Sequence, residues 1–166
     1  MTAWLRMTTE NLDRHLDRIL EIETLSFTSP WSREAFRGEV KNPASHLWVL
    51  FLGDEVQGYI CYWLVDGEMQ LATIAVHPRI RSRGTGSALL ERMIEAGLSE
   101  GAESIWLEVR ESNKTARSLY EKAGFEPAGR RRKYYSDTEE DAIVMSLMLP
   151  SFPGKLRTPE GSSRSE

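Results

Sequence analysis

The chain has 166 residues, 40% of them hydrophobic and 28% charged, and its formal net charge at pH 7 is −4. These values are ordinary for one globular domain with a core of its own, and the acidic balance argues against general affinity for nucleic acid. The single cysteine, Cys61, excludes an internal disulfide framework and fits a reducing compartment, so we expect a cytoplasmic protein.

Two further classes of protein are disfavoured. The first residues lack the apolar stretch of a signal peptide, and no apolar stretch approaches the length that spans a membrane. The histidines are scattered along the chain, at His15, His46 and His77, so the sequence predicts no metal site. We therefore expect neither a membrane partner nor a bound metal.

The first part of the chain predicts a short strand and a helix. Residues 5–7 form the candidate strand, and Thr8 or Thr9 can cap the helix that follows. The apolar residues of this helix recur at the spacing that places them on one face, at Leu12, Leu16, Ile19 and Leu20.

A turn at residues 27–32 separates this helix from a second one. Ser32 is expected to cap the second helix, and Trp31 and Phe36 occupy the two positions of a hydrophobic staple around it. Trp31 has two interpretations. It only pins the turn, or it forms a wall of a substrate site, because loops carry function more often than regular elements do.

Three strands follow, joined by two tight turns. The strands are predicted at residues 46–52, 55–64 and 68–76, which are rich in apolar and β-branched side chains. The turns are Gly53-Asp54 and Asp66-Gly67, and an Asp-Gly pair is the strongest type of hairpin signal.

The third of these strands leads into a glycine-containing loop and then into an amphipathic helix over residues 87–98. Glycine lacks a Cβ atom, so the backbone N–H groups beside Gly84 and Gly86 can approach a ligand closely. The start of the helix adds unpaired N–H donors and the positive end of the helix dipole. The loop therefore predicts an anion site, most naturally for phosphate, with positive charge at its rim from Arg79, Arg81 and Arg83.

The remaining elements predict a strand at residues 104–109, a helix capped by Ser112 or Asn113, and two final strands at residues 125–135 and 141–149. The whole order predicts a mixed α/β (α+β) domain over residues 1–149, with a mostly antiparallel sheet of about seven strands flanked by about four helices. Residues 150–166 hold Pro, Gly and Ser with almost nothing to bury, so we expect a polar, disordered tail.

Two residues are candidates for chemistry. Glu108 interrupts the apolar strand at residues 104–109, and the alternation of a strand places it on the same face as Trp106. It is either an exposed residue on a half-buried strand or a general base. Tyr120 follows Asn113 by about two helical turns, so both lie on one side of the helix, and Tyr120 is either a core residue or a proton donor.

The densest basic run is found at residues 130–133. It is either a solvated strand face or a contact for an acidic surface or for ribosomal RNA, and the acidic run at residues 137–141 can neutralise it across the hairpin. With the acidic net charge of the whole chain, we expect no direct binding of nucleic acid.

Several of these motifs occur together in one known family. Residues 76–90, with Val-His-Pro before the glycine loop and Ala-Leu-Leu after it, resemble the pyrophosphate-binding motif of the GCN5-related N-acetyltransferases (GNAT). Residues 107–125, Leu-Glu-Val-Arg-x-Ser-Asn-x-x-Ala-x-x-Leu-Tyr-x-x-x-Gly-Phe, look like the ribosomal-protein-alanine N-acetyltransferase subfamily. Residues 30–32, 131–135 and 140–142 fit the same subfamily, so the resemblance covers nearly the whole chain to about Leu149.

This resemblance implies the GNAT fold and an acyltransferase that uses acetyl-CoA as its co-substrate. In the subfamily the glutamate of Leu-Glu-Val accepts a proton and the tyrosine of Leu-Tyr donates one, and the matching residues are Glu108 and Tyr120. Trp31, Tyr134 and Tyr135 become candidate acceptor-binding residues. The implied cofactor contacts are Ile74, Ala75 and Val76 along the pantetheine arm, together with Arg81, Ser82, Arg83, Gly84, Thr85, Gly86, Ser87 and Asn113.

The leading hypothesis is therefore direct acetylation of the N-terminal amine of a small-subunit ribosomal protein, with alanine favoured as the first residue. Two alternatives stay open. The same fold can acetylate other protein N-termini, lysine side chains or a small amine, or it can serve as a non-catalytic CoA-binding module, against which the intact Glu108 and Tyr120 argue.

Overall fold

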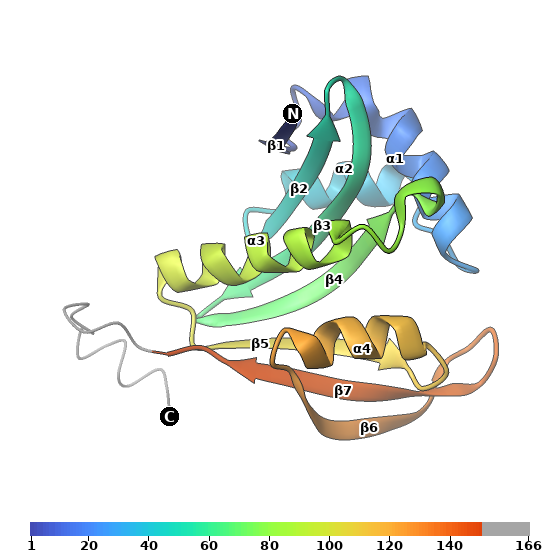
Figure 1. Cartoon of the computed structure of the whole chain (residues 1–166), viewed down its shortest axis with the longest axis vertical. Helices are drawn as coiled ribbons and strands as arrows, with labels where there is room; N and C mark the ends of the chain where they lie inside the picture. Colours follow the sequence, from blue (N-terminus) through green and yellow to red (C-terminus); the bar gives the residue numbers. More distant parts are fainter. Residues whose placement is uncertain (151–166) are drawn as a thin grey trace.

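A seven-stranded sheet runs through the computed structural model, which describes residues 1–150 (Figure 1). The tail predicted at residues 150–166 lies, after Pro150, outside the described residues. In chain order the strands are β1 (Thr2–Arg6), β2 (Ser45–Leu52), β3 (Glu55–Val65), β4 (Glu68–Val76), β5 (Ser104–Arg110), β6 (Glu126–Tyr135) and β7 (Glu140–Met148).

The order of the strands across the sheet is β1-β2-β3-β4-β5-β7-β6. Among the described strands only the neighbours β4 and β5 are parallel, and the other neighbours are antiparallel. The mixed, mostly antiparallel sheet that the sequence predicts is confirmed.

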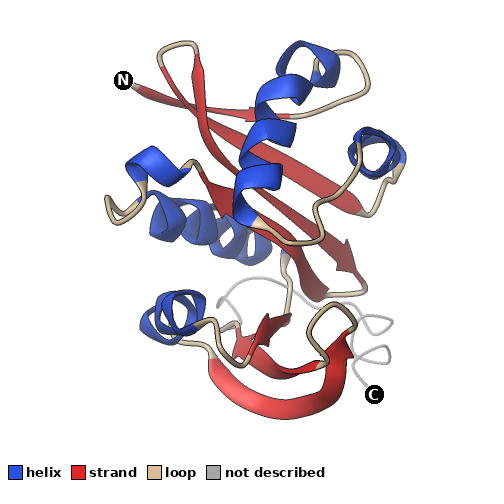
Figure 2. Ribbon diagram, turned by 90° about the vertical axis from the view of Figure 1, so that its right-hand side faces the viewer, coloured by secondary structure: helices blue, strands red, loops and turns tan. Residues whose placement is uncertain are grey.

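Helices cover both faces of this sheet (Figures 1 and 2). They are α1 (Leu12–Ser26), α2 (Arg33–Lys41), α3 (Thr85–Glu100) and α4 (Lys114–Lys122), with a short 3₁₀ turn, η1 (Pro78–Ile80), before α3. The apolar faces of α1 and α2 pack on one side of β2 and β3, and those of α3 and α4 pack on the other side of the sheet. None of the helices in residues 1–150 is long and apolar enough to cross a membrane.

The turn before α1 differs from the sequence prediction. Neither Thr8 nor Thr9 caps this helix, which begins one turn later, after Asn11. The Asn11 side chain instead accepts a hydrogen bond from the Thr8 N–H (2.7 Å) and donates one to the Arg6 carbonyl (3.0 Å). Asparagine and threonine side chains stabilise tight turns as readily as helix starts, and here the turn prevails.

The other predicted caps are confirmed. Ser32 Oγ accepts a hydrogen bond from the Ala35 N–H (3.1 Å) at the start of α2, and the rings of Trp31 and Phe36 lie 5.2 Å apart as a staple. Of the two residues expected to cap α4, Asn113 does so.

The pairing of β4 with β5 sets the position of the candidate site. It extends only over Glu68–Gln70 and Ser104–Trp106, after which the two strands diverge (Figure 1). On its other side β4 stays paired with β3 as far as Val76. The second half of β4 therefore presents backbone N–H and C=O groups that no neighbouring strand takes up on the β5 side.

Gly58 allows β3 to lie close to this half of β4. A Cβ atom at Gly58 would lie 2.6 Å from the Ala75 carbonyl oxygen and 3.1 Å from Leu89 Cδ1. The first neighbour is backbone, which cannot rotate away. The absence of a side chain at this position is therefore required by the packing.

Gly58→Ala should lower the free energy of unfolding by about 1–3 kcal/mol, the usual cost of overpacking a core. Gly38→Ala is the matched control, because Gly38 lies within α2 and no heavy atom lies within 4 Å of the place that a methyl group would take there. That control should gain about 0.5–1 kcal/mol from better helix propensity. Urea unfolding measures both, and equal stability of the two variants would contradict the packing argument.

Candidate active site

Glu108 lies on β5 just beyond the point where β4 and β5 separate. The burial pattern of β5 alternates, so Glu108 points to the face opposite the buried Leu107 and Val109, as predicted. Its side chain is 18% exposed. One carboxylate oxygen accepts a hydrogen bond from Gln70 Nε2 (3.0 Å), and the other lies 3.5 Å from Arg131 Nη2. The carboxylate is thus oriented by two other strands, β4 and β6.

Tyr120 approaches the same region from α4. It is 5% exposed, and its ring packs beside Phe125 in the core that α3 and α4 share with the sheet. The hydroxyl makes no hydrogen bond to any residue in the part of the chain that the structure describes. Burial raises the pKa of Tyr120 above its ordinary value, so the phenol keeps its proton at neutral pH and has a free hydrogen-bond donor.

Tyr135 connects these two residues. It is half-buried at the end of β6, close enough to interact electrostatically with both Glu108 and Tyr120. Burial is the main cause that raises the pKa of Tyr135 to about 12, and Arg110, whose guanidinium lies 4.1 Å from the ring centroid, lowers it. Tyr134 stands exposed beside it, with the two rings 5.2 Å apart. Tyr135 therefore lies within electrostatic range of Glu108, and Tyr134 lies next to Tyr135.

The predicted anion loop lies at the end of β4. Gly84, at φ 82°, is in the left-handed region that favours glycine and forms the N-cap of α3. No side chain caps this helix start, and the first intrahelical bond runs from the Ala88 N–H to the Gly84 carbonyl. The N–H groups of the first turn therefore have no side-chain cap, which is the arrangement that the predicted anion site requires. At Gly86 a Cβ would lie 3.4 Å from Leu119 Cδ2 on α4, an ordinary van der Waals distance, so the start of α3 lies close to α4.

The side chain of Arg81 is used within the protein. Its Nε donates to the Val76 carbonyl (3.1 Å), and its Nη2 donates to Ser26 Oγ (2.9 Å) at the end of α1. It thus connects the loop with the end of β4 and with the first helix. Arg83 is exposed, and Ser82 has a positive φ of 68°.

Asn113 lies at the start of α4. Its side-chain oxygen accepts the Ala116 N–H (3.1 Å) as the N-cap of this helix. The interaction uses the oxygen alone, so the side-chain NH₂ group keeps two donors that a cofactor could accept.

A polar cluster that sequence reasoning missed joins two loops beside Glu108. Arg110 Nη2 lies 2.7 Å from Asp137 Oδ2, in the turn between β6 and β7, and the hydroxyl of Thr28, in the loop between α1 and α2, donates to the same oxygen (2.5 Å). Arg110 also donates to Thr138 (3.0 Å). We call Thr28, Arg110 and Asp137 the loop bridge. Alternation along β5 puts Arg110 on the face of Glu108, but nothing local in the sequence indicates its partners.

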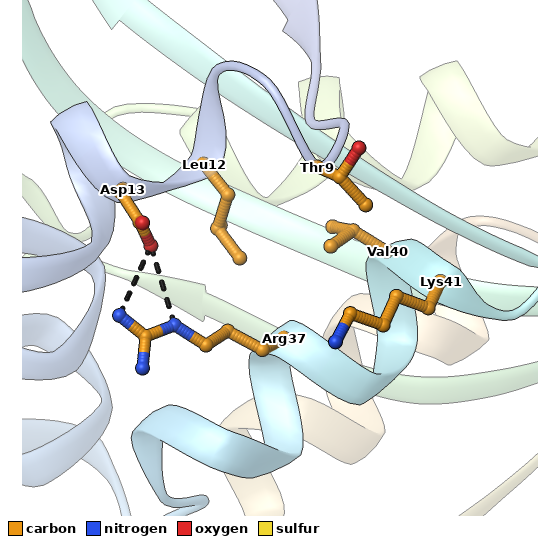
Figure 3. Close-up of a pocket in the computed structure, with 6 residues that line it drawn as sticks. All are labelled: Thr9, Leu12, Asp13, Arg37, Val40 and Lys41. Atoms are coloured by element: carbon orange, nitrogen blue, oxygen red, sulfur yellow. Dashed lines mark hydrogen bonds and ion pairs between the residues drawn. The ribbon is translucent and has the colours of Figure 1, made fainter.

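A pocket of about 190 Å³ lies elsewhere, between the start of α1 and α2 (Figure 3). Arg37 and Asp13 form an ion pair across it, at 3.3 Å. None of its lining residues is a predicted site residue, so its position does not bear on the chemistry. The other residues that line this pocket are Thr9, Leu12, Val40 and Lys41. Elsewhere too, within residues 1–150, no group of three metal-ligating side chains converges.

Comparison with known proteins identifies the class to which this fold and site belong. The model of the acetyltransferase (GNAT) family matches residues 16–125, and the chain therefore belongs to that family. A relative from Bacillus subtilis (strain 168) is 38% identical over 135 residues, which are 81% of this chain and 89% of the relative.

Two further relatives have names that state an activity. The ribosomal protein bS18-alanine N-acetyltransferase of Salmonella typhimurium is 38% identical over 131 residues, 78% of this chain and 88% of that protein. The crystal structure of the ribosomal-protein-S18-alanine N-acetyltransferase from Escherichia coli has a TM-score of 0.82 at 32% identity and covers 95% of this chain and 100% of its own. The predicted fold and the predicted family are confirmed.

Asp137→Asn should make the stability less sensitive to acid. Hydrogen bonds from Arg110 and then Thr28 lower the pKa of Asp137 to about 2 from an ordinary value of 3.8. Because the folded-state pKa is the lower one, the carboxylate stabilises the fold above about pH 4 and loses this effect as the pH falls towards 2. The difference in urea midpoint between wild type and Asp137→Asn should therefore be largest near neutral pH and shrink in acid.

Thr28→Val is the control for the weaker arm of the loop bridge. It removes one donor to Asp137 and leaves Arg110 in place, so its midpoint should lie between those of wild type and Asp137→Asn. A midpoint difference for Asp137→Asn that stays constant from neutral pH to about pH 2 would rule out the loop bridge as its source.

Proposed function

We propose that this acetyltransferase moves the acetyl group of acetyl-CoA to the N-terminal amine of a ribosomal protein, with alanine favoured as the first residue. The relatives named for this activity support the acceptor. The observation that carries the chemistry is the arrangement of Glu108 and Tyr120. A carboxylate and a free phenol O–H border the opening between β4 and β5 from opposite faces of the sheet.

The cofactor side of the proposal rests on backbone geometry. The edge of β4 at Ile74, Ala75 and Val76 has no strand partner on the β5 side and suits the amide groups of the pantetheine arm, because those groups pair as a strand would. The Val76 carbonyl already accepts a hydrogen bond from Arg81, so the other groups of this edge are the ones available. The uncapped start of α3 at Thr85–Ser87 suits the pyrophosphate. Residues 81–84 shape this loop, and Asn113 is the N-cap of α4, a helix that lies close to the start of α3 at Leu119 and Gly86.

Glu108 and Tyr120 would divide the proton transfers. An N-terminal amine has a pKa near 7.7–8.0, so much of it carries an extra proton at neutral pH and cannot attack. Glu108 accepts that proton, directly or through water, and the amine nitrogen forms a bond to the thioester carbon. The carbon–sulfur bond then breaks, and the Tyr120 hydroxyl supplies a proton to the departing thiolate. The bonded nitrogen loses its second proton, which returns Tyr120 to its neutral form, so the products are the amide and the CoA thiol. No acyl group passes through Cys61, which is buried and whose pKa burial raises to about 12.

The acceptor side would be formed by Trp31, Tyr134 and Tyr135. Tyr135 lies within electrostatic range of Glu108 with Tyr134 next to it, and the loop bridge holds the turn that carries Trp31 near the same strand. A ribosomal acceptor also implies that the protein works in the cytoplasm.

A panel of amines tests the acceptor. Acetyl-CoA turnover is measured with a peptide that begins with alanine, the same peptide with a blocked N-terminus and an internal lysine, and a polyamine. The alanine peptide should be strongly preferred. Turnover of only the lysine peptide or only the polyamine would show that the acceptor is not a protein N-terminus. Binding of CoA without turnover of any amine would favour a non-catalytic module.

Gly86→Asp should abolish acetyl-CoA binding, because a carboxylate at the start of α3 repels phosphate and displaces it from the N–H groups. Gly86→Asn has nearly the same size and no charge, so it separates repulsion from bulk. Gly86→Asn should bind more weakly than wild type but measurably. Calorimetry on the folded variants measures their affinity for acetyl-CoA. An unchanged affinity in Gly86→Asp would show that the loop is not part of the cofactor site.

Glu108→Gln and Tyr120→Phe should separate in their pH profiles. Glu108→Gln loses the base and should be slower by about 10²-fold or more near neutral pH, and this deficit should shrink as the amine deprotonates in solution. Tyr120→Phe should lower kcat with little change in fold, and its deficit should persist at high pH because the thiolate still lacks its donor. Equal losses at every pH would show that the two residues act together in placing the substrate.

A further inference from the structure

We propose that Glu23 is a positioning residue that holds the loop between α1 and α2, residues 27–32, in the conformation that receives the acceptor. The proposal rests on the proposed function for the nature of the acceptor. It concerns a buried carboxyl group that the proton transfers do not use.

Glu23 contacts both ends of this loop. It lies in the last turn of α1, and its side chain is only 1% exposed. Its backbone carbonyl accepts the N–H of Phe27, where the loop begins (3.0 Å). Its side-chain Oε2 accepts the N–H of Trp31, where the loop ends (2.9 Å). The residue before Trp31 is Pro30, which has no backbone N–H and cannot donate this hydrogen bond.

The other carboxylate oxygen is held by the sheet. Glu23 Oε1 accepts the hydroxyl of Tyr59 at 2.5 Å, and Tyr59 is fully buried on β3. Burial raises the pKa of Glu23, and the hydrogen bonds from Trp31 and Tyr59 oppose that shift. A buried carboxyl costs free energy unless its oxygens are hydrogen-bonded, whereas an apolar side chain of the same volume would fill the space without that cost. What the carboxyl adds is a fixed attachment for the loop backbone.

The loop is linked both to the strand proposed to bind the cofactor and to the strand that carries Glu108. Tyr59 is paired in the sheet with Ala75, on the edge of β4 proposed to bind the pantetheine arm. Near its other end the loop is joined through Thr28 to Arg110, on the strand that carries Glu108. If the hydrogen bonds of Glu23 are lost, residues 27–32 should therefore move relative to the acceptor, while the β4 edge and the glycine loop stay in place.

Three variants separate this role from general stability. Glu23→Met keeps the volume and removes both acceptors. Glu23→Gln is the conservative rescue, because its oxygen can accept the Trp31 N–H while its amide donates to the Tyr59 oxygen. In the double variant Glu23→Met, Tyr59→Phe the buried hydroxyl is also gone, so much of the stability should return while the loop stays unattached.

The first measurement is steady-state kinetics with an alanine-starting peptide. Glu23→Met and the double variant should raise the KM for the peptide about tenfold, the scale of one lost hydrogen bond, with the KM for acetyl-CoA within about twofold of wild type. Glu23→Gln should resemble wild type. If the peptide KM of the double variant recovers together with its stability, Glu23 is only a structural residue and the proposal is overturned.

The second measurement does not need a known acceptor. Hydrogen exchange followed by mass spectrometry should show faster exchange at residues 27–32 in Glu23→Met and in the double variant, with residues 104–110 unchanged. Unchanged exchange at residues 27–32 would overturn the proposal even if the enzyme acetylates the peptide. Failure of wild type to acetylate any alanine peptide, with the loop still released in these variants, would instead overturn the proposed acceptor.

Discussion

The arrangement of the candidate site depends on the short pairing between β4 and β5. Three residue pairs, from Glu68–Ser104 to Gln70–Trp106, hold the two halves of the sheet together before the strands diverge. Each half keeps its shape because each strand has an antiparallel neighbour on its other side, β3 for β4 and β7 for β5. Divergence leaves the facing edges of both strands without a strand partner in the middle of the sheet, β4 beyond Gln70 and β5 beyond Trp106. The last pair before the opening also carries Gln70, whose amide orients Glu108.

The two sides of this opening are built by different means. On the proposed cofactor side the available groups are backbone: the edge of β4 and the N–H groups at the start of α3, with glycines required at Gly58 and Gly84. On the proposed acceptor side two loops without strand partners are held by side chains. Glu23 attaches the first loop from within the core, and the loop bridge joins it to the second at the surface. A fixed phosphate geometry suits the first arrangement, and a peptide of varied sequence suits the second.

Apart from the fold and the family, what the sequence predicts correctly is local. The cap at Ser32, the staple of Trp31 on Phe36 and the face of Glu108 each depend on residues within one turn or one strand. The incorrect prediction of a cap at Thr8 or Thr9 is also local. The side chains of threonine and asparagine can stabilise either a helix start or a tight turn, and the sequence does not show which of the two is more stable here. The family resemblance supplied roles for Glu108 and Tyr120 that alternation and helical spacing left open.

Long-range partners account for the rest. Gln70 and Glu108 are 38 residues apart, Arg81 and Ser26 are 55 apart, and Thr28 and Asp137 are 109 apart. Each contact arises because the fold brings distant segments together, and no spacing rule reaches that far. Helical spacing places Glu23 on the apolar face of α1 and the exposed Glu21 off it, but it does not indicate which groups satisfy the buried carboxylate. The difference lies in its partners: Glu21 pairs with Arg18 in solvent, where an ion pair contributes about 0–1 kcal/mol, whereas Glu23 fixes a loop to the core. Glu23 is thus identified by the two donors that its buried carboxylate satisfies, the Trp31 N–H and the Tyr59 hydroxyl.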